Sequence, residues 1–324
     1  MIKYLSSLLV LFLSIPALFA GCPGCGGFSG QSGSNALGII GSLSSGMGDP
    51  ANFITLTYSE GSYGPQDTSK VLAGLKYNLN HWLGLHMAAT YLDSEGTVTL
   101  PWDEIEYATN GVGDLAFAVT ADLTGRTKFT PCPVDGNFLP IKDFLHIMAM
   151  AGTSFPTGKY TYENDYGLYP SEYQLGTGTY DPFVGAALFK RWGRWQPQLT
   201  TVYKFSGGKN DANYWRGDAL LSKLDLIYFI NPYKKITVLA SITHSRVSDD
   251  ERDYSWGTED MYLEVTGTSG NTTMGTLAWG MEIIDRLRIN LAWTTSIQEP
   301  DSADSAGKSI GDQYSVGFGY RFGK

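Results

Sequence analysis

The feature that most constrains the fold is a strict alternation of residue types at the C-terminal end of the chain. Residues 311–324 carry apolar or aromatic side chains separated by single small or polar residues: Tyr314, Val316, Phe318, Tyr320 and Phe322. A period of two residues predicts a β-strand with one apolar and one small or polar face. This pattern is typical of the closing strand of an outer-membrane barrel, whose apolar face contacts lipid and whose other face contacts water.

The composition agrees with a barrel. The chain has 39 glycines, which suit tight turns and close strand packing, and 20 tyrosines and 8 tryptophans, as expected if aromatic belts mark two membrane interfaces. Charged residues are 17% of the chain, against about 25% in average soluble proteins. The net charge of -9 argues against nucleic acid as a partner, because nucleic-acid binding needs a basic patch.

The N-terminus has the pattern of a secretory signal peptide. Lys3 precedes an apolar run over residues 5–20, and small residues follow. We predict a signal peptide over 1–20, with a retained membrane anchor as the alternative. After residue 21 no run approaches the roughly 18 to 20 apolar residues of a spanning helix. A chain of this kind can therefore cross a membrane only as a closed barrel.

Residues 21–50 are rich in Gly and Ser and bury too little apolar surface to fold alone. We expect a flexible periplasmic segment there, with a plug inside the barrel as the alternative. The chain has three cysteines, Cys22, Cys25 and Cys132. The sequence before Cys22 is similar to a lipoprotein cleavage site, so one reading is lipid on Cys22 and a Cys25–Cys132 disulfide. The alternatives are a Cys22–Cys25 disulfide with Cys132 free, or signal cleavage after Ala20 with no lipid.

From residue 51 to the end, alternating segments separated by turn residues predict an all-β, antiparallel, up-and-down transmembrane barrel of about twelve strands. The predicted strands are 53–59, 69–79, 82–93, 113–123, 143–155, 181–191, 195–205, 218–230, 235–247, 273–284, 287–298 and 311–324. Short connections near 80, 193, 232 and 285 alternate with long ones near 64, 100, 168, 211, 255 and 305. The segment 124–142 breaks this rule, which leaves ten or fourteen strands as alternatives.

No set of residues has the spacing of a catalytic, cofactor or metal site, so we expect neither an enzyme nor a cofactor. The four histidines, His81, His86, His146 and His244, are scattered. An outer-membrane phospholipase needs a Ser–His pair, and no serine at a fixed strand offset supports that role for His146. The acidic loop 249–260 has the oxygen ligands that calcium prefers, but their spacing is typical of a solvated charged loop.

Charged residues on the predicted inward face are the main functional clue. The candidates for lining the lumen are Lys70, Lys76, His86, Asp114, Asp122, Lys204, Lys223, Asp225, Glu282, Arg288 and Arg321. An interior with both signs of charge is either a water-filled pore with weak ion selectivity or a salt-bridged interior that holds the barrel's shape.

Three short motifs extend this interpretation. They are Gly-Val-Gly-Asp-Leu at 111–115, Phe-Pro-Thr-Gly at 155–158 and Gly-Thr-Gly-Thr-Tyr-Asp at 176–181. In this order they resemble a family of bacterial outer-membrane proteins that is named for the meta-cleavage pathway of phenol degradation and described as transporter-like. With the C-terminal strand, the resemblance covers roughly residues 50–324. It implies an outer-membrane barrel and passage of aromatic or other hydrophobic compounds, and it carries over no catalytic residues.

These observations predict a protein of the bacterial outer membrane that contacts lipid and lets small solutes pass, with aromatic or hydrophobic compounds as candidates. The alternative is a non-transporting barrel that serves as a structural protein or as a scaffold. In that case a periplasmic partner would dock on residues 21–50 and 124–142.

Overall fold

A computed structural model describes residues 52–322, except for 64–65, 81, 101–102, 125–144, 165–166, 170–173, 191, 232–235, 254–261, 266–269, 285 and 299–309. The predictions for the signal peptide, for residues 21–50, for the three cysteines and for His81 lie outside the described residues. Within the described part, no helix is long and apolar enough to cross a membrane.

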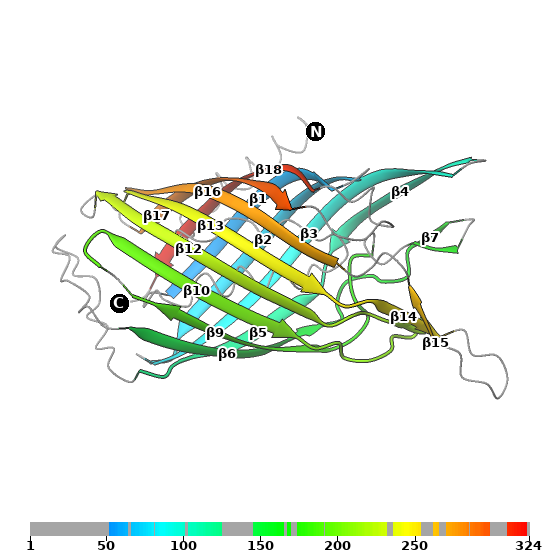
Figure 1. Cartoon of the computed structure of the whole chain (residues 1–324), viewed down its shortest axis with the longest axis horizontal. Coiled ribbons are helices and arrows are strands. Elements are labelled where there is room, and N and C mark those ends of the chain that lie inside the picture. Colours follow the sequence, from blue (N-terminus) through cyan, green and yellow to red (C-terminus); the bar gives the residue numbers. More distant parts are fainter. Residues whose placement is uncertain are drawn as a thin grey trace.

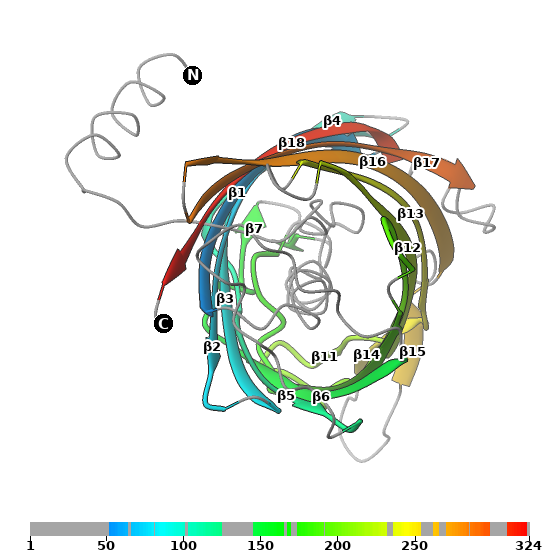
Figure 2. The ribbon, with the colours of Figure 1, turned by 90° about the vertical axis from the view of Figure 1, so that its left-hand side faces the viewer.

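Twelve antiparallel strands close into a barrel, as the sequence predicts (Figures 1 and 2). The strands are β1 (Asn52–Tyr63), β2 (Gln66–Asn78), β3 (Leu83–Leu100), β5 (Leu115–Asp122), β6 (His146–Phe155), β9 (Asp181–Phe189), β10 (Trp195–Lys204), β12 (Ala219–Asn231), β13 (Ile236–Val247), β16 (Gly270–Ile284), β17 (Leu287–Gln298) and β18 (Ile310–Phe322). Each strand pairs with the next one in the barrel, and β1 pairs with β18 to close it, in a register that runs from Asn52 opposite Phe322 to Tyr63 opposite Ile310.

The remaining strands belong to the connections at one end of the barrel. β4 (Asp103–Val112) pairs with the distal half of β3 and forms a hairpin that extends beyond the barrel (Figure 1). β7 (Glu163–Asn164) and β8 (Gly167–Leu168) form a two-stranded sheet. β11 (Tyr214–Trp215), β14 (Asp250–Asp253) and β15 (Tyr262–Val265) form a three-stranded sheet. We call this end the loop end and the opposite one the turn end.

Two predicted loops are wrong. The segment 94–111 is a β-hairpin, because β3 continues to Leu100 and pairs with β4 down to Val112 opposite Tyr91. The connection near residue 64 is short, because β1 and β2 remain paired as far as Tyr63 opposite Gln66. The alternation of apolar and polar residues stops where a strand leaves the lipid. The backbone hydrogen bonds between paired strands continue beyond that point, so the strands are longer than the alternation predicts.

The outer face of the barrel carries an exposed apolar band between two sets of aromatic side chains. Exposed aromatics near the turn end are Tyr77, Trp82, Trp192 and Trp195, and those near the loop end are Tyr91, Tyr180, Phe205 and Tyr314. Between them lie exposed aliphatic side chains, among them Leu199, Leu224, Ile242, Leu277 and Leu291. An exposed apolar band bounded by aromatic residues is the surface that a bilayer covers.

Candidate functional site: the barrel interior and the loop end

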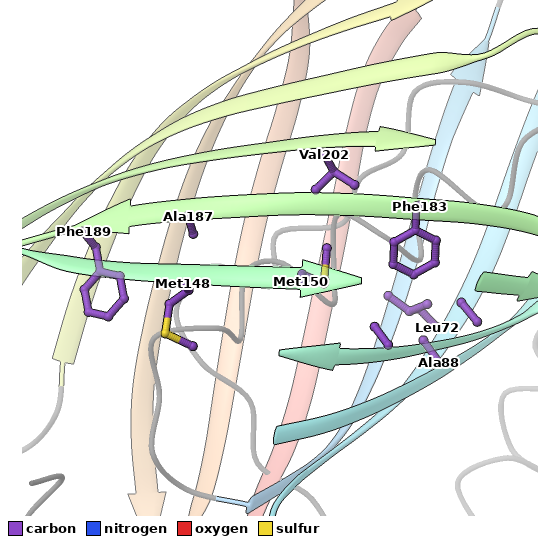
Figure 3. Close-up of a cluster of buried hydrophobic side chains, with 10 residues drawn as sticks. Leu72, Ala88, Met148, Met150, Phe183, Ala187, Phe189 and Val202 are labelled. Carbon is purple, nitrogen blue, oxygen red and sulfur yellow. The ribbon is translucent and has the colours of Figure 1, made fainter. Parts of the chain in front are cut away.

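The interior face of the barrel carries buried polar side chains on both sides, such as Thr90, Thr120 and Thr200 on one and Thr243 and Thr294 on the other, and one side also carries an apolar cluster. On β2, β3, β5, β6, β9 and β10, inward side chains form one apolar cluster, which we call the apolar wall (Figure 3): Leu72, Ala88, Ala116, Ala118, Met148, Met150, Phe183, Ala187, Phe189 and Val202. On β13, β16, β17, β18 and β1, buried hydroxyls and amides predominate, and we call this part the polar wall: Ser241, Thr243, Ser245, Thr272, Asn290, Thr294, Gln313, Thr57 and Ser59. This division does not follow from the predicted list of charged residues.

The charged candidates on the strands lie on the interior face, and several of them pair with one another. Lys204 Nζ lies 3.1 Å from Asp181 Oδ2, and Lys223 Nζ lies 3.0 Å from Asp225 Oδ1. All four side chains are buried. Two opposite charges this close neutralise each other, so much of the interior charge does not remain for a solute.

The other pairs are looser. Arg321 Nη2 lies 3.7 Å from Glu282 Oε2, and Arg288 Nε donates to Asn290 Oδ1 at 3.2 Å. Arg288 also donates through Nη2 to the Thr237 hydroxyl on β13. These groups lie towards the turn end, on β13, β16, β17 and β18.

The interior histidines have protein partners. His86 Nε2 is 3.0 Å from Thr120 Oγ1, and His146 stacks on the Phe189 ring, with the ring centroids 4.6 Å apart. His146 Nδ1 lies 3.7 Å from Asp122 Oδ2. The remaining predicted candidates lie on β2, where Lys76 pairs with His86 across the strands and Lys70 lies opposite Leu92, nearer the loop end. His244 is exposed on the outer face, with its Nδ1 3.1 Å from Thr273 Oγ1.

At the loop end, Asp114 joins the three sequence motifs into one network. The sequence predicts that this side chain points into the lumen, whereas its carboxylate is buried against the neighbouring loop. It accepts hydrogen bonds from Gly158 N at 2.9 Å, from Thr177 N at 2.8 Å and from the Thr177 hydroxyl at 2.9 Å. Thr157 Oγ1 in turn accepts from Leu115 N at 2.9 Å. The segment between β6 and β9 is thus bonded at both of its ends to the start of β5.

Glycine is required where these segments meet. A Cβ on Gly176 would lie 2.4 Å from the Gly158 carbonyl oxygen and 2.7 Å from Asp114 Oδ1. Gly178 has a φ of +74°, in the left-handed region that glycine adopts without strain. The spacing of the motifs therefore reflects close backbone contact rather than a binding loop.

The same arrangement recurs along this end of the barrel. Asp181 accepts from Gly207 N at 3.0 Å, Asp218 from Ser206 N at 2.7 Å, and Asp250 from Gly217 N at 2.7 Å. Each aspartate stands at or next to a strand start and bonds the backbone of a different segment. The sequence analysis did not single out this role for Asp181, Asp218 or Asp250, although an aspartate at a strand start was a usable signal.

Arg216 and Asn210 link this end of the barrel further. Arg216 Nη2 donates to the Gly176 carbonyl at 3.3 Å, and Asn210 Nδ2 donates to the Thr177 carbonyl at 3.0 Å. Burial raises the pKa of Asp114, although the hydrogen bonds from Gly158 and Thr177 and the charge of Arg216 act in the opposite direction. We call this set of contacts around Asp114 the latch.

Among the described residues, no group of His, Cys, Asp or Glu side chains has the geometry of a metal site. For the calcium alternative in the acidic loop, Asp250 is the informative residue. Its carboxylate accepts hydrogen bonds from Gly217 N and the Tyr214 hydroxyl, so it is used by the protein itself.

Comparison with known proteins gives only distant likeness. No family model matches the chain, and no curated protein matches its sequence. The NanC porin is 10% identical, with a TM-score of 0.43 over 84% of this chain and 100% of that one. The KdgM porin in complex with disordered oligogalacturonate is 8% identical, with a TM-score of 0.42 over 83% and 99%. The translocator domain of autotransporter NalP from Neisseria meningitidis is 9% identical, with a TM-score of 0.40 over 84% and 87%.

Likeness at this level carries no argument about function, so the class of this protein rests on its own geometry. The strands close on themselves, the outer face is an apolar band between aromatic side chains, and the inner face is largely polar. Closure satisfies every strand edge within lipid, where water is absent. The chain is therefore an outer-membrane β-barrel.

Proposed function

We propose that this barrel is a passive channel for small solutes across the outer membrane. The observation that carries the proposal is the polar wall, where buried hydroxyls and amides cover the inner face of consecutive strands. A polar interior inside a lipid-facing barrel suits water and solutes. A twelve-stranded barrel is wider than an eight-stranded one, whose core side chains fill, and narrower than a general porin.

The proposed lining comprises the charged candidates of the sequence analysis together with the polar wall. The buried pairs Lys204–Asp181 and Lys223–Asp225 cancel charge locally. Weak ion selectivity follows, because no single sign of charge dominates the interior.

Passage of aromatic or hydrophobic compounds is the finer proposal. Its support is the apolar wall, which places apolar side chains on the inner face beside the polar ones. It agrees with the resemblance to the family named for the meta pathway of phenol degradation, and that resemblance stays a prediction. Catalysis is not part of the proposal.

Residues 1–20 are proposed as a signal peptide.

Planar-bilayer recording tests the channel. Refolded protein should give discrete conductance steps, with a reversal potential close to zero in a salt gradient. Heat-denatured protein at the same detergent concentration is the control. Absence of steps above this control would overturn the channel proposal and favour the scaffold.

The scaffold is the second candidate because the latch and the buried ion pairs also suit a rigid, closed barrel.

Liposome flux tests whether aromatic solutes pass through the barrel. Benzenesulfonate, an aromatic anion that does not cross lipid by itself, should enter liposomes that contain the barrel. Equal exclusion of benzenesulfonate and of a small sugar from conducting liposomes would contradict passage of aromatic solutes.

A further inference from the structure

One stretch of the polar wall carries buried polar atoms that have no hydrogen-bond partner in the part of the chain that the structure describes. Ser241 on β13 pairs with Thr276 on β16, Thr276 pairs with Thr294 on β17, and Thr294 pairs with Gln313 on β18. Cross-strand partners face the same side of a sheet, so these four side chains form a continuous line along the interior. We call it the hydroxyl row.

The two ends of the row differ from its middle. Thr276 Oγ1 and Thr294 Oγ1 lie 2.9 Å apart and bond to each other. Among the described residues, Ser241 Oγ and Gln313 Oε1 have no hydrogen-bond partner, although the two side chains are only 5% and 6% exposed. An unmet buried polar atom costs about 1–3 kcal/mol. A partner other than the described residues is therefore expected at both ends of the row.

The neighbouring interior positions are small. Ala278 on β16 pairs with Ala292 on β17, which pairs with Ser315 on β18. These side chains occupy little of the interior next to the row. A molecule that lies along the row would meet a shallow apolar and hydroxyl surface beside it.

The chemistry of the row selects a neutral partner. Gln313 Oε1 only accepts, so it requires a donor, and the Ser241 hydroxyl both donates and accepts. Asp225 continues the row beyond Ser241, but Lys223 Nζ, 3.0 Å away, neutralises it. Among the described residues of the row and its extension, an anion would meet an acceptor and no unpaired cation, and a cation would meet no net negative charge. Hydroxyl groups satisfy both ends, because each can donate and accept.

We propose that the hydroxyl row is a binding site for a neutral, hydroxyl-bearing solute of the size of a monosaccharide or polyol. The inference rests on the proposed channel function, since the solute reaches the row through the barrel. Nothing in the proposal requires the solute to be aromatic.

Ligand-observed NMR on the refolded barrel in detergent tests the site, with glucose as the probe. Saturable binding of glucose is expected, and glucuronate, which has the same ring with a carboxylate, should bind more weakly. Ser241→Ala and Gln313→Met should each weaken glucose binding roughly threefold to tenfold, the loss of one net hydrogen bond.

Ser154→Ala is the matched control. Ser154 on β6 is also buried, and its hydroxyl has no partner, but it lies on the side of the apolar wall. This variant should bind glucose as the parent does. Folding of all variants is checked by heat-modified migration on gels, and the conservative Ser241→Thr should retain binding if Ser241→Ala fails to fold.

Two results would overturn the site: absence of saturable binding, or an equal effect of Ser241→Ala and Ser154→Ala. The channel is read out separately. Conductance without glucose binding would overturn the proposed binding site and keep the proposed channel function. Glucose binding without conductance would overturn the channel function and keep the binding site.

Discussion

The two walls of the barrel interior have the same strand geometry but differ in how their inward side chains are packed and paired. On the apolar wall, side chains fill the space left by glycines: a Cβ on Gly152 would lie 2.5 Å from Phe183 Cζ, and one on Gly185 would lie 2.9 Å from Val202 Cγ2. On the polar wall, Ser241 and Gln313 have atoms without partners among the described residues and lie on one cross-strand line, whereas Ser154 is one such position on the other side. Close packing stabilises a fold, whereas unmet polar atoms destabilise it unless something else binds them. The apolar wall therefore contributes close packing, whereas the polar wall holds two unmet polar atoms on one line.

The largest effect is expected from the buried ion pair on the side of the apolar wall. Lys204→Met leaves the Asp181 carboxylate buried without its cation, which should lower the free energy of unfolding by about 3–5 kcal/mol. Urea unfolding of the refolded barrel measures it. The double variant Lys204→Met/Asp181→Asn should recover part of the loss. A loss below about 1 kcal/mol in the single variant would mean that water solvates the pair.

The next largest loss of unfolding free energy is expected from removal of a packed aromatic side chain. Phe183→Ala creates a cavity beside Gly152 and should cost about 3 kcal/mol of unfolding free energy, while Phe183→Leu should cost less. The matched change on the polar wall is Thr243→Ala, for which we expect less than about 1 kcal/mol. If Phe183→Ala and Thr243→Ala lowered the free energy of unfolding equally, the two walls would not differ in their contribution to stability.

The latch should give an intermediate effect. Asp114→Asn removes the charge and one of the acceptor oxygens that bind Gly158 and Thr177, and it should cost about 1–3 kcal/mol. Limited proteolysis between β6 and β9 should become faster, because that segment loses its bonds to the start of β5. The control is Asp93→Asn, an exposed position on β3. If both variants resist protease as the parent does, the latch does not hold the segment.

The smallest effect is expected within the hydroxyl row. Thr276→Val removes the hydrogen bond to Thr294 and should change the unfolding free energy by about 0.5–1.5 kcal/mol. Thr294→Val should have a similar effect, and the double variant should cost less than the sum, since both changes remove the same bond. Additive losses would show that the two hydroxyls do not bond.

The barrel was predictable from sequence because one face of each strand meets lipid. Period-two alternation, as at Tyr314 and Phe318, then indicates both the strand and the side that each residue faces. The same pattern failed over 94–111, where the β3–β4 hairpin extends beyond the lipid and its polar residues resemble a loop.

The site was less predictable. Asp114 bonds residues 44 and 63 positions away in the chain, and alternation carries no information about such contacts. The sequence indicated that Lys204 and Asp225 face inward but not which groups neutralise them. Nor did it distinguish the two walls, because Thr, Ser, Ala and Met are all compatible with an inward position. Only the cross-strand register brings Ser241, Thr276 and Gln313 into one line.

The pairing of β1 with β18 has a consequence for how the protein is made. β18 follows every other barrel strand in the chain, so β1 keeps an open backbone edge until β18 has been made. The barrel therefore cannot close before β18 is present, and until then the free edge of β1 can pair with another chain.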